Sequence, residues 1–159
     1  RRAAGFGMKV LYWNRNARDD AAAALGATRC ADLDELLGQA DFVSLHLPLT
    51  VETEALIDAA RLAAMKPGAV LINTARGAVV DEAALIEALQ SGRLAAAGLD
   101  VFAAEPSVPA ALLAMDQVVL TPHIGSATSA CRTDMAMRAL NNLLTFLGGG
   151  TPPDRLPAP

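Results

Sequence analysis

The sequence is poor in aromatic residues and cysteine, and each shortage narrows what its 159 residues can form. Aromatic side chains make up 4% of the chain, so aliphatic residues and alanine, within a hydrophobic content of 53%, must fill the core of one domain. The two cysteines, Cys30 and Cys131, lie far apart and in no metal-ligand spacing. They are typical of free thiols in a reducing compartment and support neither a disulfide framework nor a structural zinc site.

Charge is also scarce, and so are long apolar runs. Eleven of the 13 basic residues are scattered arginines in a chain of net charge −4, so no basic stripe predicts a nucleic-acid partner. No apolar run approaches the ~20 residues of a membrane span, and the opening RRAAGFGMKV lacks the apolar stretch of a signal peptide. We therefore expect a cytoplasmic protein with no membrane partner.

Short β-rich runs alternate with segments of helical pattern along the chain. Strands are expected at 8–13, 27–30, 41–47, 69–75, 96–101 and 117–121. Helices are expected at 17–26, 33–40, 54–65, 81–92 and 126–149. Most of the strands are apolar throughout, which favours parallel strands covered on both faces. The alternation predicts an α/β fold with a doubly wound, Rossmann-like parallel sheet.

Turn and capping residues support these boundaries. Asp81 is placed to cap the helix at 81–92, with Gly92 at its end, and Asp32 is placed to cap the helix at 33–40. The opening RRAAGFG predicts the last turn of a helix, with Gly5 and Gly7 turning into the first strand. These glycines precede a strand, whereas a dinucleotide-binding fingerprint follows one, so they are a loop and not that fingerprint.

Charged side chains follow several of the expected strands. Arg76 follows the strand at 69–75, Asp100 lies at the end of the next one, Glu105 stands four residues past Val101, and His123 follows the last strand. In an open α/β sheet, ligands bind outside these carboxyl ends. A guanidinium can hold a carboxylate in a bidentate fork, and a histidine oriented by a carboxylate can deliver a proton. This set suits chemistry on 2-oxo or 2-hydroxy acids, with a cofactor supplying the hydride.

Each of these residues has a structural alternative. Arg76 can be a surface arginine, Asp100 can bond a neighbouring backbone N–H, Glu105 can be an exposed loop carboxylate, and His123 can be a capping or loop histidine. For His46, at the end of the strand at 41–47, a buried, hydrogen-bonded structural role is favoured.

Three segments resemble a known family, the D-isomer-specific 2-hydroxyacid dehydrogenases. They are HLPLTVETEALID (46–58), the run from MKPGAVLINTARG to LDVFAAEP (65–106), and LTPHIGSAT (120–128). Together they span about half the chain in the family's order and spacing. The family includes phosphoglycerate dehydrogenase, glyoxylate/hydroxypyruvate reductase and 2-ketogluconate reductase.

The resemblance implies roles and an activity. It implies that Arg76 binds the substrate carboxylate and polarises its carbonyl, that Glu105 pairs with His123 as the acid/base, and that Asp100 contacts the nicotinamide carboxamide. It implies an NAD(P)H-dependent reductase of small 2-oxo acids, working as a homodimer. Further cofactor-lining residues implied by the resemblance are Leu47, Pro48, Thr53, Thr74, Ala75, Gly125 and Ser126.

The end of the first strand bears on the cofactor. In NAD-preferring members an acidic residue there accepts hydrogen bonds from the ribose, whereas an arginine accommodates a 2′-phosphate. Here Asn14 and Arg15 follow the strand, and no carboxylate precedes Asp19. We therefore expect NADP in preference to NAD, and a substrate of the glyoxylate, hydroxypyruvate or 2-ketogluconate type.

The chain departs from the family in what precedes its first strand. The family's Gly-rich loop, its first strand and its substrate domain have no counterpart here, so we interpret 1–149 as a partial NAD(P)-binding domain and 150–159 as an irregular tail. Without the central strand of the order 3-2-1-4-5-6, the sheet should split. We expect the 159 residues to be part of a longer polypeptide and to be poorly active alone. A corepressor-type, non-catalytic dinucleotide-binding module and an inactive fragment stay open as alternatives.

Overall fold

The computed structural model describes residues 2–17 and 19–156, and the chain divides into two compact units between His123 and Ile124. The strands are β1 (Val10–Tyr12), β2 (Ala27–Arg29), β3 (Phe42–Leu45), β4 (Ala69–Asn73), β5 (Leu94–Leu99) and β6 (Val118–Leu120). The helices are α1 (Arg2–Gly5), α2 (Asp19–Leu25), α3 (Leu33–Gln39), α4 (Ala59–Ala64), the 3-10 turn η1 (Gly77–Val79), α5 (Glu82–Gln90), α6 (Ala110–Leu113) and α7 (Ser129–Leu147). Parts of the expected elements at residues 1, 18 and 157–159 lie outside the described residues.

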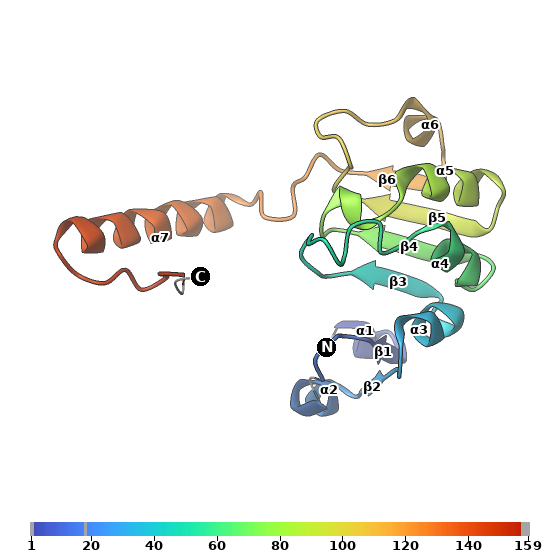
Figure 1. The fold of residues 1–159 in the computed structure, drawn as a ribbon, viewed down its shortest axis with the longest axis horizontal. Helices are drawn as coiled ribbons and strands as arrows, with labels where there is room; N and C mark the ends of the chain where they lie inside the picture. The colour runs from blue at the N-terminus through green and yellow to red at the C-terminus, as the bar shows by residue number, and fades with distance from the viewer. Residues whose placement is uncertain (1, 18, 157–159) are drawn as a thin grey trace. The chain divides into compact units, whose positions relative to one another are not determined.

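The first unit contains two separate parallel sheets (Figure 1). One pairs β1 with β2, and the other has the order β3-β4-β5-β6. Within the described part of the chain, no strand joins β1 to β3. This arrangement confirms the predicted α/β fold with a parallel sheet divided where a central strand would lie.

Within the first unit, helices cover one face of the four-stranded sheet, so the expectation of two covered faces is wrong for this unit taken by itself. Val43 and Leu45 of β3 are buried, whereas their neighbour Phe42 is 54% exposed. Val119 of β6 is 67% exposed. Because these strands follow each other in sequence order, right-handed crossovers carry all the connecting helices to the same side.

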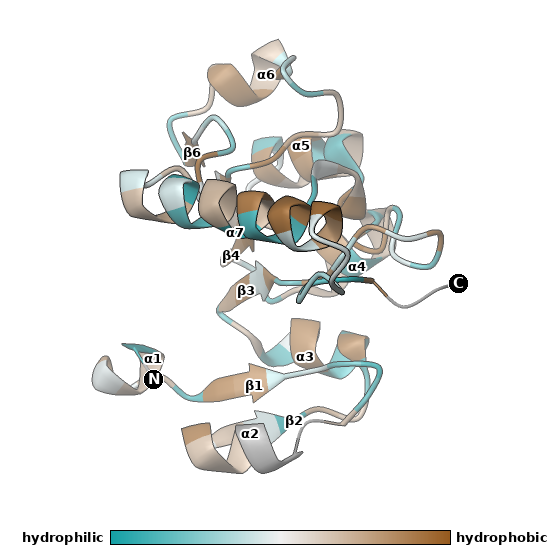
Figure 2. Ribbon diagram, turned by 90° about the vertical axis from the view of Figure 1, so that its left-hand side faces the viewer, coloured by the Kyte–Doolittle hydropathy of each residue, from teal (hydrophilic) through white to brown (hydrophobic). Residues whose placement is uncertain are grey.

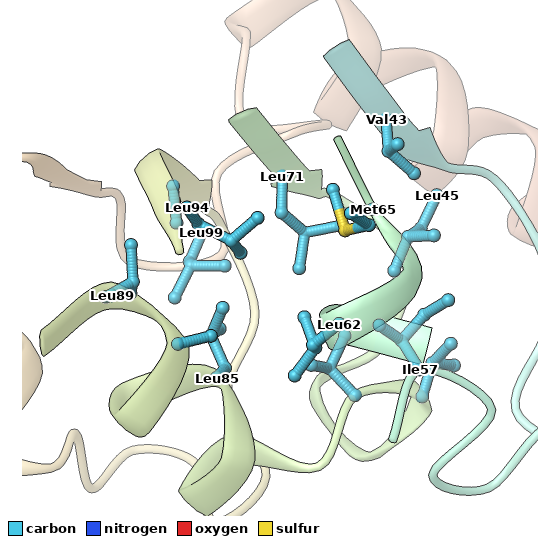
Figure 3. Close-up of a cluster of buried hydrophobic side chains, with 14 of the residues drawn as sticks. Val43, Leu45, Ile57, Leu62, Met65, Leu71, Leu85, Leu89, Leu94 and Leu99 are labelled. Atoms are coloured by element: carbon cyan, nitrogen blue, oxygen red, sulfur yellow. The ribbon is translucent and has the colours of Figure 1, made fainter. Parts of the chain in front are cut away.

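The covered face holds the core of the unit (Figure 3). Leu62 of α4 and Leu85 of α5 pack over this face, where Leu71 of β4 is completely buried. Helices α4 and α5 each begin at an aspartate. Aspartate caps were predicted from the sequence for α5 and for α3, but not for α4. The Asp58 carboxylate accepts the Arg61 N–H at 2.9 Å, and the Asp81 carboxylate accepts the Ala84 N–H at 3.1 Å. Such caps contribute about 1 kcal/mol each and fix where the crossovers start.

Several predicted boundaries shift. The helix expected at 54–65 begins only at Ala59. Ile57 forms a parallel β-bridge with Val80, so its backbone is extended and not helical. The helix expected at 126–149 begins at Ser129, where the Thr128 hydroxyl accepts the Cys131 N–H. Strand β5 begins two residues earlier than predicted, at Leu94, and α6 was not predicted at all.

The described part of the second unit consists of residues 124–128, helix α7 and the segment that follows it up to residue 156. Figure 2 shows apolar stretches along α7, where Leu144 and Phe146 are more than half exposed. Residues 151–156 form neither helix nor strand, but Asp154 bonds them to α7. The Asp154 carboxylate accepts hydrogen bonds from Arg138 Nε at 2.6 Å and Asn142 Nδ2 at 2.8 Å, and its own N–H donates to Asn142 Oδ1.

This anchor should titrate only in strong acid. The Arg138 guanidinium, and then the Asn142 amide, lower the pKa of Asp154 to about 2. A depressed carboxyl pKa means that the anchor is fully present above the ordinary range, near pH 4, and is lost as the pH falls through about 2. NMR of the backbone amide at position 154 should therefore show that residues 151–156 detach from α7 near pH 2 in the parent. In Asp154→Asn they should already be detached at neutral pH. Release of the parent segment above pH 4 would contradict this assignment, and Asp134→Asn on the same helix is the control.

Candidate active site

The loop that carries Arg76 is held by a buried asparagine. Asn73, the last residue of β4, is 1% exposed; its side-chain oxygen accepts the Ala75 N–H at 3.0 Å and its side-chain amide donates to the Arg76 carbonyl at 2.9 Å. The sequence analysis did not identify this role of Asn73. The position of an asparagine directly before Thr-Ala-Arg-Gly could have indicated that its side chain bonds the backbone of this loop. The Arg76 side chain is exposed, with one guanidinium N–H donating to the Ala75 carbonyl.

His123 and Glu105 form a hydrogen-bonded pair. The His123 Nδ1 lies 2.8 Å from Glu105 Oε2, and Glu105 Oε1 accepts the Phe102 N–H at 3.0 Å. The hydrogen bond to His123 is the largest cause that lowers the pKa of Glu105, followed by the Phe102 N–H, with a smaller contribution from the charge of Arg76. The carboxylate therefore stays ionised and favours a proton on Nδ1, which leaves Nε2 as the ring nitrogen that can exchange a proton with a ligand.

The backbone of His123 is in a conformation that L-residues seldom adopt. Its φ is 52°, in the left-handed region, which costs a non-glycine residue about 1–2 kcal/mol. Such conformations cluster at functional sites, where the surroundings hold them. The bond from the His123 N–H to the Thr121 carbonyl, at 3.0 Å, forms the tight turn directly after β6.

Asp100 is buried at the neighbouring strand end. It is 6% exposed, and its carboxylate accepts a hydrogen bond from the Thr121 hydroxyl. Its backbone N–H donates to the Asn73 carbonyl at 3.0 Å, which continues the pairing of β4 with β5. The residue therefore joins the carboxyl ends of three neighbouring strands.

A cleft of about 460 Å³ opens beside Arg76, at the carboxyl ends of β3 and β4. It is lined by His46, Leu47, Pro48, Leu49, Thr74, Ala75 and Arg76. The prediction of a buried His46 is wrong, because this side chain lies on the uncovered sheet face and is exposed, although Ser44 Oγ does bond its ring nitrogen at 2.8 Å. Thr53 shapes the cleft wall, since its hydroxyl donates to the Pro48 carbonyl at 2.8 Å.

The remaining predicted cofactor residues belong to other segments of the chain. Asn14 and Arg15 are exposed just beyond β1. Arg15 contributes to the lowered pKa of Glu52, whose largest cause is the hydrogen bond from Thr50. Gly125 and Ser126 belong to the second unit. Among the described residues, no cluster of three His, Cys, Asp or Glu side chains suits a metal ion, and no helix is long and apolar enough to cross a membrane.

Comparison with known proteins agrees with this geometry. Residues 1–125 match the family model of the D-isomer specific 2-hydroxyacid dehydrogenase, NAD binding domain. The chain belongs to this family. This result confirms the resemblance carried by the three motifs, and it identifies the two sheets as parts of a dinucleotide-binding domain.

Individual relatives narrow the comparison. The chain is 49% identical over 154 residues to a glyoxylate reductase of Thermococcus litoralis, covering 97% of this chain and 46% of the relative. It is 53% identical over 146 residues to a glyoxylate/hydroxypyruvate reductase B of Serratia proteamaculans, covering 91% and 45%. A crystal structure of an NADPH-dependent glyoxylate/hydroxypyruvate reductase from Sinorhizobium meliloti superposes with a TM-score of 0.86 at 38% identity, covering 95% and 46%. The chain thus spans about half the length of the relatives it matches.

Proposed function

We propose that the protein containing this chain reduces small 2-oxo acids, of the glyoxylate, hydroxypyruvate or 2-ketogluconate type, to D-2-hydroxy acids with a nicotinamide dinucleotide. The hydrogen-bonded pair of His123 and Glu105 carries this proposal, because a dinucleotide-binding module without chemistry has no use for an oriented proton donor. The reductases named above support the substrate class. A cytoplasmic homodimer without nucleic-acid or membrane partners is part of the same proposal.

Arg76 is proposed to bind the substrate carboxylate. Its guanidinium is exposed beside the cleft, on a loop fixed by Asn73, and can present two parallel N–H groups. A bidentate fork fixes the carboxylate and therefore the position of the adjacent carbonyl carbon and oxygen. The same positive charge polarises the carbonyl.

His123 is proposed to deliver a proton to the carbonyl oxygen as the carbon is reduced. Glu105, held ionised by its two hydrogen bonds, bonds the Nδ1 side of the ring and fixes its orientation. The 2-oxo acid thereby gains one hydride at carbon and one proton at oxygen. In the reverse direction, the neutral imidazole takes the proton from the hydroxyl.

The residues of the cleft fit the nicotinamide half of the cofactor. Leu47, Pro48 and Ala75 offer an apolar wall, while Thr74 and the buried Asp100 offer polar groups at the same sheet edge. Thr53 is proposed to complete the lining, and the family resemblance supports Gly125 and Ser126 as further cofactor contacts. When bound, the dihydronicotinamide supplies the hydride.

NADPH is proposed as the preferred cofactor, because Asn14 and Arg15 stand where NAD-preferring enzymes carry a carboxylate. The kcat/KM for NADPH should exceed that for NADH, and Arg15→Ala should reduce this ratio by about tenfold, the effect of losing one exposed charged contact of ~1.4 kcal/mol. The Arg29→Ala variant, which removes an exposed arginine on β2, is the control. A parent enzyme that prefers NADH would refute the assignment.

The proposed activity is tested with a panel of glyoxylate, hydroxypyruvate, 2-ketogluconate and pyruvate, each with NADPH and NADH. Oxidation of the dinucleotide with glyoxylate, hydroxypyruvate or 2-ketogluconate, and chiral analysis giving the D-hydroxy acid for a substrate whose product is chiral, are expected. The absence of turnover with every 2-oxo acid, in a protein that binds the cofactor, would refute the proposal and favour a binding module.

A further inference from the structure

Two loops of the first unit approach each other more closely than any residue with a side chain allows. A Cβ added to Gly77 would lie 1.9 Å from the Phe102 carbonyl carbon, 2.1 Å from its oxygen and 2.4 Å from the Ala103 nitrogen. These are backbone atoms, so no side-chain rotation relieves the overlap. Gly77 does not have a positive φ, so close approach, and not backbone conformation, requires a glycine here.

This contact joins the two halves of the site. Gly77 directly follows Arg76, the proposed carboxylate-binding residue. On the other side of the contact, the Phe102 N–H donates to Glu105 Oε1 at 3.0 Å, and Glu105 Oε2 bonds His123 at 2.8 Å. The backbone contact at Gly77 therefore lies next to Arg76 in the sequence. Through Phe102 and Glu105, it is linked to the His123 imidazole by two hydrogen bonds.

A glutamate secures the same loop from a second direction. Glu82 is in the first turn of α5, and its Oε1 accepts the Ala103 N–H at 3.3 Å. Asp81 already caps this helix through the Ala84 N–H, so the Glu82 carboxylate is not needed for the cap. Ala103 is thus bonded by Glu82 and seated against Gly77.

We propose that Gly77 and Glu82 are positioning residues, which seat the loop at 102–105 and so set the separation between Arg76 and the pair of Glu105 and His123. The inference rests on the proposed reductase function. The carboxylate and the carbonyl of a 2-oxo acid are adjacent, so the groups that hold them must stand at one fixed separation. A displacement of about 1 Å at a reacting centre costs about 10²-fold in rate.

The first test is Gly77→Ala, with Gly98→Ala as a matched control, because a Cβ on Gly98 of β5 meets only Ile72 Cγ1 at 3.9 Å. We expect Gly77→Ala to lower kcat by about 10²-fold. We also expect the pKa of the Glu105 carboxyl to rise toward its ordinary value, because the displaced loop withdraws the Phe102 N–H and disturbs the bond to His123. Selective ¹³C labelling of glutamate follows this titration, with Glu105→Gln assigning the signal.

The second test uses Glu82 and stays informative if Gly77→Ala does not fold. Glu82→Gln keeps a side-chain oxygen that can accept the Ala103 N–H and should retain activity, whereas Glu82→Ala should lower kcat and raise the Glu105 pKa. Glu87→Ala on the same helix is the control. Because the titration needs no turnover, it tests positioning even in a protein inactive toward 2-oxo acids, which would refute only the function. The proposal is overturned if Gly77→Ala and Glu82→Ala both show an unchanged Glu105 titration, or both show a parental kcat. If Gly77→Ala does not fold, either result in Glu82→Ala alone overturns it.

Discussion

Replacing His123 by alanine is expected to lower kcat of the 2-oxo acid reductase by about 10²- to 10⁴-fold, the usual contribution of a positioned general acid. The dissociation constant for the dinucleotide should stay close to that of the parent, because the ring is held by Glu105 and is half exposed. Stopped-flow reduction of glyoxylate measures the rate, and fluorescence titration with NADPH measures binding. A parental kcat in His123→Ala would remove His123 from the mechanism.

The unusual backbone of His123 calls for a second variant. Alanine at a φ of 52° bears the same strain as histidine without its hydrogen bond, so a loss of rate could arise from a rearranged turn. Asparagine visits the left-handed region more readily than other non-glycine residues. His123→Asn should therefore keep the turn and the melting temperature while losing the rate, which separates proton transfer from local structure.

The same pair of variants distinguishes the two classes of function left open by the sequence. A reductase loses kcat and keeps cofactor affinity, whereas a dinucleotide-binding module has no catalytic rate to lose. Glu105→Gln supplies an intermediate point, since it keeps a hydrogen-bonding side chain beside the ring but removes the negative charge of the carboxylate. Its rate should fall between those of the parent and of His123→Asn.

The features predicted correctly from the sequence depend on local patterns. Asp81 caps α5 and Gly92 ends it with a φ of +73°, because capping and left-handed turns are decided within a few residues. The strand-end rule also selected Arg76, Glu105 and His123 as candidates, and their roles stay predictions that the variants of these residues test.

The features that were missed depend on contacts between distant residues. The bridge between Ile57 and Val80, which delays α4, joins positions 23 residues apart with no spacing signal. The close approach of Gly77 to Phe102 is equally invisible in a linear pattern. His46 was expected to be buried because it ends an apolar strand, yet burial depends on which sheet face the crossovers cover.

Replacing Arg76 should have the other large effect. Two hydrogen bonds to a charged group contribute about 3 to 5 kcal/mol together, so Arg76→Ala should lower kcat/KM for glyoxylate by about 10²- to 10⁴-fold. Arg76→Lys keeps the charge but not the planar fork, and should recover only part of this loss. Guanidinium added to Arg76→Ala should restore some activity, whereas it should not help His123→Asn.

A substrate without a carboxylate provides the control within the same enzyme. An aldehyde or ketone of similar size cannot use the guanidinium fork, so its kcat/KM should be low in the parent and fall far less in Arg76→Ala than that of glyoxylate. If both substrates lost the same factor, Arg76 would act on the carbonyl or on the structure of the loop, and not on the carboxylate. Because the Asn73 side chain bonds the backbone of Ala75 and Arg76, and not the guanidinium, the loop itself should survive the substitution. An unchanged melting temperature in Arg76→Ala would assign the loss to recognition of the carboxylate.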